Sequence, residues 1–220
     1  MGVGLVATVV VLSVVTVVDL GLPETVRNIV LMLPLQIGGL AGTAVGFLWA
    51  NDRGLGYVRL RKPSLKHLGI AFGSIFAMLA AVIGVTAVLQ SLGQQAADHA
   101  TTQQIESDPT LALYMIPLAL FVIGPCEELL FRGVIQGLFR RAYGIVPGIV
   151  AAGAIFGLIH WVALVGQGSA EAYVAIAFLS GVILGAVYEL TGNILVPIAV
   201  HSLWNCIVYV TLYSETVGSL

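Results

Sequence analysis

The sequence consists largely of apolar stretches of about 20 residues, separated by short polar segments. Because an α-helix rises about 1.5 Å per residue, about 20 apolar residues cross a hydrocarbon core of about 30 Å. The bilayer core offers no water to backbone amides, so stretches of this kind must form helices that pack on helices. We therefore predict an all-α fold, a polytopic membrane helical bundle.

The prediction comprises about seven spans in a single membrane-embedded domain, residues 1–220. The spans are Val3–Val18, Asn28–Ala50, His67–Leu92, Leu111–Phe139, Gly144–Val165, Glu171–Leu190 and Ile194–Tyr213. Apolar residues make up 59% of the chain and charged residues 9%, which is far from the soluble average. No basic residue precedes the first stretch and no Ala-x-Ala site follows it, so we expect a short span rather than a signal peptide.

Basic residues predict the orientation of the bundle. Five of the nine lie in the connector between the second and third spans: Arg53, Arg59, Arg61, Lys62 and Lys66. The next connector contains only acidic charges, and Arg140 and Arg141 follow the fourth span. Because basic loops stay in the cytoplasm, we expect the first connector there. Seven spans then place the amino terminus inside and the carboxyl terminus outside.

Ionisable and amide side chains occur inside three of the predicted spans. They are Glu127, Glu128 and Arg132 in the fourth, His160 in the fifth, and His201 and Asn205 in the seventh. A charged side chain at a helix centre costs roughly 2.5–3.5 kcal/mol on insertion scales, so such groups usually mark function. Each is unfavourable alone, and we expect all of them to converge on one hydrated pocket.

Helical spacing predicts which of these side chains can pair and which point to a different neighbour. Glu128 and Arg132 are four residues apart and can pair, whereas Glu127 projects about 100° away toward another neighbour. Pro125 lacks an amide hydrogen, which should bend the helix beside the carboxylates. The alternative is that Glu128 and Arg132 form a simple ion pair near the headgroups.

Elsewhere, Gly38, Gly42 and Gly46 recur at a spacing typical of close helix packing.

A pocket with these groups has what amide hydrolysis requires. Glu127 would take a proton from water, His160 would hold and polarise that water, and Glu128 would brace the site through Arg132. His201 and Asn205 would donate to the carbonyl oxygen. Two histidines and a glutamate are also suited to Zn²⁺, but the chain lacks the motif HExxH. We favour no cofactor, with zinc as the alternative, and expect Cys126 and Cys206 to serve packing.

Three motifs make the sequence similar to the CPBP intramembrane peptidases, which include the type II CAAX prenyl proteases and the Abi proteins. EExxxR occurs as Glu127, Glu128 and Arg132, FxxxH as Phe156 and His160, and HxxxN as His201 and Asn205. The resemblance covers about residues 111–213. It implies an intramembrane endopeptidase in which Glu127 activates water with the help of His160, while His201 and Asn205 form the oxyanion site.

The resemblance also implies the partners and the location. The substrate would be a peptide or a lipidated protein in the lipid bilayer, including CAAX-type processing, with access from the cytoplasm and a location in the cell membrane. The net charge of −2 gives no reason to expect nucleic acid. A proton-coupled transporter is the main alternative, because intramembrane Glu and His also relay protons. A non-catalytic immunity or scaffold protein is the third.

Overall fold

The computed structural model describes residue 13 and residues 23–218. The predicted first span, Val3–Val18, lies outside these residues apart from Ser13. Six helical rods in the described part are long and apolar enough to cross a membrane: Thr25–Ala50, Leu65–Ser91, Thr110–Tyr143, Ile145–Ala163, Ala170–Thr191 and Leu195–Gly218. They match the other six predicted spans closely. The prediction of an all-α, polytopic helical bundle is confirmed.

Two of the rods are composite. The first contains α2 (Glu24–Leu33), the π-helix η1 (Pro34–Ala41) and α3 (Gly42–Ala50). The third contains α6 (Thr110–Leu118), η2 (Ala119–Ile123), α7 (Gly124–Glu128), η3 (Leu129–Gln136) and α8 (Gly137–Tyr143). The remaining rods are α4 (Leu65–Ser91), α9 (Ile145–His160) with the 3₁₀ turn η4 (Trp161–Ala163), α10 (Ala170–Thr191) and α11 (Leu195–Gly218).

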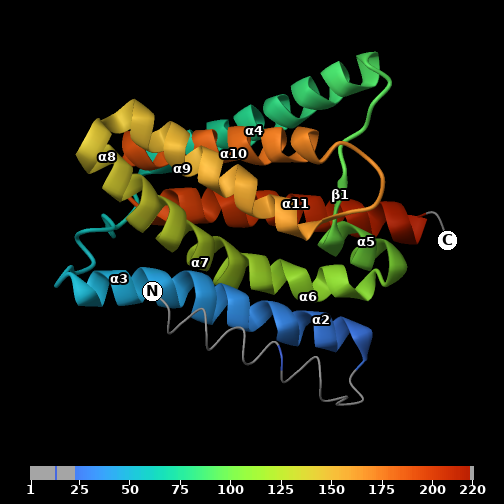
Figure 1. Ribbon diagram of the computed structural model, residues 1–220, viewed down its shortest axis with the longest axis horizontal. Helices are drawn as coiled ribbons and strands as arrows, with labels where there is room; N and C mark the ends of the chain where they lie inside the picture. The colour runs from blue at the N-terminus through green and yellow to red at the C-terminus, as the bar shows by residue number, and fades with distance from the viewer. Residues whose placement is uncertain (1–12, 14–22, 219–220) are drawn as a thin grey trace.

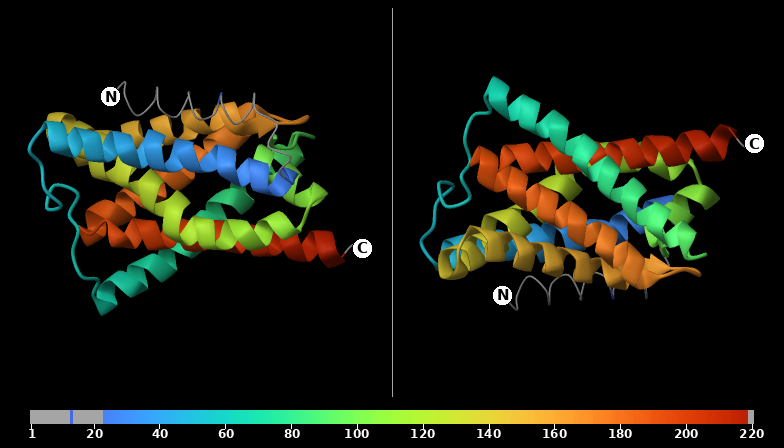
Figure 2. Two further views of the ribbon diagram at one scale, coloured as in Figure 1. Left: turned by 90° about the horizontal axis from the view of Figure 1, so that it is seen from below. Right: turned by 90° about the horizontal axis from the view of Figure 1, so that it is seen from above.

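The rods run side by side along the length of the molecule (Figure 1). The first rod lies at one edge and α4 at the opposite edge, with the third rod, α9, α10 and α11 between them (Figures 1 and 2). Helix α11 contacts α4, α6, α7 and α10, and η1 contacts α7. The segment around α7 is therefore enclosed between the first rod and α11.

The two ends of the bundle differ in their polar contacts. At one end, Glu189 of α10 accepts a hydrogen bond from Arg59 (3.1 Å) and forms an ion pair with Arg140 (2.9 Å), so both predicted groups of basic residues lie together. At the other end, the two-residue strands β1 (Asp98–His99) and β2 (Leu164–Val165) pair antiparallel, and α5 (Ala100–Ser107) follows β1. This pairing ties the connector after α4 to the connector after α9.

Glycine governs how closely α9 approaches α10. A Cβ added to Gly157 would lie 2.9 Å from the carbonyl oxygen of Val174 and 3.1 Å from the backbone nitrogen of Phe178. The close helix approach expected at Gly42 and Gly46 is not seen among the described residues. Within them, a Cβ on Gly46 meets nothing within 4 Å, and one on Gly42 meets only a carbonyl of its own rod.

We predict that Gly157→Ala destabilises the fold by about 1–3 kcal/mol, because its methyl group would meet backbone atoms that cannot rotate away. Gly46→Ala is the matched control. It should be neutral or stabilising by up to about 1 kcal/mol, since alanine is the better helix former. Thermal unfolding in detergent measures both, and a midpoint for Gly157→Ala at or above that of the wild type would contradict the prediction.

Candidate active site

The third rod is irregular around the two glutamates. Its α7 segment, which contains Glu127 and Glu128, lies between the π-helical segments η2 and η3. Pro125 stands in the first turn of α7 and cannot supply an amide hydrogen. A π-helical turn contains an additional residue, so it changes the direction in which later side chains point, and such turns are frequent at functional sites. The π-helical segment η2 ends at Ile123, two residues before Pro125.

Glu128 is the centre of a fully buried charged cluster. Arg132 Nη1 donates to Glu128 Oε1 over 2.7 Å, and His201 Nδ1 lies 2.8 Å from the same oxygen. The exposed fractions are 0% for Glu128 and 1% for Arg132, so other parts of the protein enclose the ion pair completely. Arg132 Nη2 also donates to the carbonyl oxygen of Gly181 on α10 (3.2 Å).

Glu127 has different neighbours, as its position on the helix predicts. Gln36 Nε2 in η1 donates to Glu127 Oε1 over 2.9 Å. Glu127 Oε2 lies 3.9 Å from His201 Nε2, which is too long for a hydrogen bond. The His201 ring therefore stands between the two carboxylates, bonded to Glu128 through one nitrogen and directed toward Glu127 with the other.

Phe156 connects His160 to the charged cluster. Its ring lies 4.6 Å from the His160 ring and 5.7 Å from the His201 ring, centroid to centroid. The Arg132 guanidinium lies over the same phenyl ring at 4.7 Å. His160 Nδ1 is 2.7 Å from the carbonyl oxygen of Phe156. Because a carbonyl only accepts, Nδ1 carries the hydrogen, and Nε2 of the neutral ring is an acceptor.

The structure thus brings together Glu127, Glu128, Arg132 and His201, and places His160 one aromatic ring away. Asn205 lies one turn beyond His201 on α11 and is half-buried. Within the described part of the chain, no hydrogen bond joins the side chain of His160 or Asn205 to Glu127. The first four residues are thus in direct contact, His160 is connected to them through Phe156, and Asn205 follows His201 on the same helix.

Three polar residues near the site were not predicted. Gln36 contacts Glu127 directly, and the His99 ring of β1 lies 6.3 Å from the His160 ring. The Tyr173 ring of α10 lies 6.0 Å from His99 and 6.5 Å from His160. Burial, and secondarily the nearby His160, lowers the pKa of His99 to about 4, although Glu127 opposes this. His99 is consequently neutral at neutral pH. A lone glutamine and a connector histidine carry no sequence motif that could have revealed them.

Exposure within the site decreases toward the basic end of the bundle. His160, Asn205 and Tyr173 are half-buried, whereas Glu128, Arg132 and Gln136 are buried. The more open side of the site therefore faces the end that carries β1 and β2, opposite to Arg59 and Arg140.

The zinc alternative has no three-ligand site here. Among the residues that the structure describes, no three His, Cys, Asp or Glu side chains lie close enough together to hold a metal ion. Cys126 is buried beside Glu127, and Cys206 Sγ lies 3.7 Å from the carbonyl oxygen of Ile116. Both thiols thus have the packing environment that the sequence predicted.

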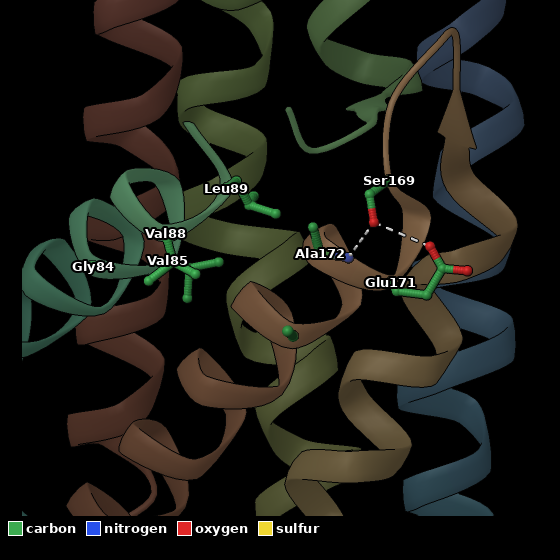
Figure 3. Close-up of a pocket in the computed structure, with 8 residues that line it drawn as sticks. Gly84, Val85, Val88, Leu89, Ser169, Glu171 and Ala172 are labelled. Carbon is green, nitrogen blue, oxygen red and sulfur yellow. Dashed lines mark hydrogen bonds between the residues drawn. The ribbon is translucent and has the colours of Figure 1, made fainter. Parts of the chain in front are cut away.

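A cavity of about 470 Å³ lies away from the site, between α4 and α10 (Figure 3). It is lined by Gly84, Val85, Val88, Leu89, Ser169, Glu171, Ala172 and Ala175. Its polar groups are engaged in the start of α10, where the backbone nitrogen of Ala172 donates to Ser169 Oγ (3.1 Å) and Ser169 Oγ donates to Glu171 (3.1 Å). None of the predicted site residues lines this cavity.

Comparison with known proteins gives one match. Residues 109–207 match the family model described as type II CAAX prenyl endopeptidase, Rce1-like. No curated protein and no solved structure matches the chain. The matched range covers all three motifs and agrees with the predicted motif region, about 111–213. Together with the six apolar rods, the match supports an integral multi-pass membrane protein.

We predict that Arg132→Met destabilises the fold by about 3–5 kcal/mol, because it leaves the buried Glu128 carboxylate without its guanidinium. Glu128→Gln combined with Arg132→Met removes both charges and should be clearly more stable than the single variant. Thermal unfolding of the purified proteins tests this. A double variant whose loss equals the sum of the two single losses would show that the pair is not coupled.

Proposed function

Residues 109–207 belong to the Rce1-like family of type II CAAX prenyl endopeptidases, and on this premise we propose that the protein is an intramembrane endopeptidase that hydrolyses peptide bonds of membrane-associated substrates. The observation that carries the proposal is the unequal environment of two adjacent carboxylates. Glu128 is bonded to Arg132 and His201. Glu127 accepts one hydrogen bond at Oε1, whereas its Oε2 lies too far from His201 for a hydrogen bond and can react with water. Because their environments differ, the two carboxylates can have different roles: Glu127 can act as the general base, and Glu128 can hold the site together.

Glu127 is the proposed general base. Its Oε2 takes a proton from water as the water oxygen bonds to the carbonyl carbon of the scissile peptide, and the carbonyl π electrons move to the oxygen. The tetrahedral intermediate then collapses. The C–N bond breaks, and the leaving nitrogen takes the proton back from Glu127, so the carboxylate is restored.

The two histidines support different parts of this step. His160 Nε2, an acceptor in the neutral ring, orients the water by accepting its other hydrogen. His201 Nε2 and the Asn205 amide donate to the developing oxyanion, where fixed donors act strongly because water is largely excluded. His201 donates from Nε2 when both ring nitrogens carry hydrogen. The contact of His201 Nδ1 with Glu128 Oε1 (2.8 Å) holds the ring so that Nε2 is directed toward Glu127.

The proposed substrate class follows from the family match. A CAAX prenyl endopeptidase acts on a peptide whose cysteine carries a lipid near the carboxyl terminus. A lipidated peptide is held at the membrane by its chain, which would present its scissile bond to a site enclosed among apolar rods. We place the protein in the cell membrane, with the lipid bilayer and such a peptide as its partners, and propose no cofactor.

We predict that Glu127→Gln lowers cleavage of a farnesylated CAAX-type peptide in lipid vesicles by about 100- to 10,000-fold, since an amide cannot accept the proton of water. Its thermal unfolding midpoint should stay near that of the wild type, because the amide oxygen still accepts from Gln36. Glu215→Gln, an exposed site at the end of α11, is the control and should leave cleavage unchanged. Full activity of Glu127→Gln would disprove the role of Glu127.

The same assay separates the proposal from its alternatives. If the wild type cleaves nothing but moves a solute across vesicles in a Glu127-dependent manner, the protein is a transporter. If it does neither, while a partner protein binds, the scaffold alternative holds.

We also predict that the purified protein keeps its peptidase activity in excess chelator, because a glutamate base and two fixed donors need no metal ion. Metal analysis of the same sample should find zinc far below one atom per chain. Loss of cleavage in chelator, restored by added Zn²⁺, would instead establish a metallopeptidase and replace the role proposed for His160.

A further inference from the structure

Gln36 is the one residue outside the family-matched region that donates a hydrogen bond to Glu127 within the described part of the chain. It lies in the first rod, 91 residues before Glu127, and both side chains are buried, with 7% and 8% exposed. The motif glutamate therefore depends on a helix that precedes the matched region, residues 109–207.

The local helix geometry directs Gln36 toward the site. Pro34 begins the π-helical segment η1 and has no amide hydrogen for the turn before it. The wider π turn changes which face later residues occupy. Gln36 is buried, whereas its neighbours Leu35 and Ile37 are exposed, at 45% and 54%. The irregular segment thus places a single amide against α7 and apolar side chains on the outer surface.

Packing alone does not account for a glutamine at this position. An amide moved into an apolar environment without its full set of hydrogen bonds costs about 1–3 kcal/mol by mutational data. Gln36 Oε1 is buried and has no hydrogen-bond partner among the described residues. Leucine would fill the same space without this cost, so the benefit of Gln36 lies in its contact with Glu127.

We propose that Gln36 is a positioning residue for Glu127, an inference that rests on the proposed peptidase function. Its amide holds Oε1 and thereby directs Oε2 toward the water and His201.

Several other groups face Glu127 and share in its electrostatics. They come from its own rod, from α10, from α11 and from β1, and they are Arg132, Cys126, Tyr173, His201, Tyr209 and His99, in addition to the adjacent Glu128. A variant at position 36 must therefore be compared with one that changes a buried amide elsewhere.

The test measures kcat, KM and the pH profile for the farnesylated peptide in vesicles. Gln36→Leu should lower kcat by about 10- to 100-fold, because a misplaced base loses its alignment, with little change in KM. Gln36→Glu should acquire an alkaline limb, a loss of activity with rising pH, since only a protonated Glu at this position can donate to Glu127.

Gln136→Leu is the matched control. Gln136 is a buried amide on the same rod as Glu127, but it donates to Gly185 and Glu189 (3.0 and 3.2 Å) and not to Glu127. This variant should lose thermal stability while its pH profile keeps the wild-type shape. If Gln36→Leu does not fold, the nearly isosteric Gln36→Glu decides.

The two proposals fail in different ways. Wild-type kcat and pH profile in the Gln36 variants, beside an active wild type, would overturn the role of Gln36 alone. An inactive wild type would overturn the peptidase proposal and this inference with it.

Discussion

The arrangement of the site depends on one buried ion pair, Arg132 with Glu128. In an apolar bundle neither charge is tolerable alone, so each requires the other and every remaining polar atom needs a partner. Arg132 also bonds to Gly181 and lies over the ring of Phe156, and Glu128 Oε1 also bonds to His201, whereas Arg132 Nε and Glu128 Oε2 have no hydrogen-bond partner among the described residues. A single electrostatic constraint thereby fixes the third rod relative to α9, α10 and α11, and it orients the His201 ring toward Glu127.

Irregular helices allow these contacts. Regular α-helices present side chains on fixed faces, whereas the π-helical segments η1, η2 and η3 lie directly beside Glu127 and Glu128. Proline contributes in two of the three cases, Pro34 and Pro125, because it removes an amide donor from the helix. The irregular turns change the directions in which side chains point, and Gln36 of the first rod thereby reaches Glu127 of the third rod.

Most of the candidate site could be predicted from the sequence because its polar side chains occur within apolar spans. Glu127, Glu128, Arg132 and His201 are costly in a membrane span, and the structure does bring them into contact. The pairing of Glu128 with Arg132 also followed from spacing alone. Gln36 was not found, because an amide in an apolar span has no distinguishing spacing and its partner lies 91 residues away. Within the described residues, the close glycine contact lies at Gly157 and not at Gly42 or Gly46, since spacing does not say which helix is the neighbour.

By itself, the sequence determined that this chain forms a bundle of membrane-spanning helices and which polar groups they carry, because hydrophobicity and helical rise are local properties. Only the tertiary structure decided that Gln36 contacts Glu127, that Phe156 stands between His160 and His201, and that the more open side of the site faces away from the basic connector. These relations join residues on different rods. They follow from how the rods pack, and no local pattern in the chain encodes that packing.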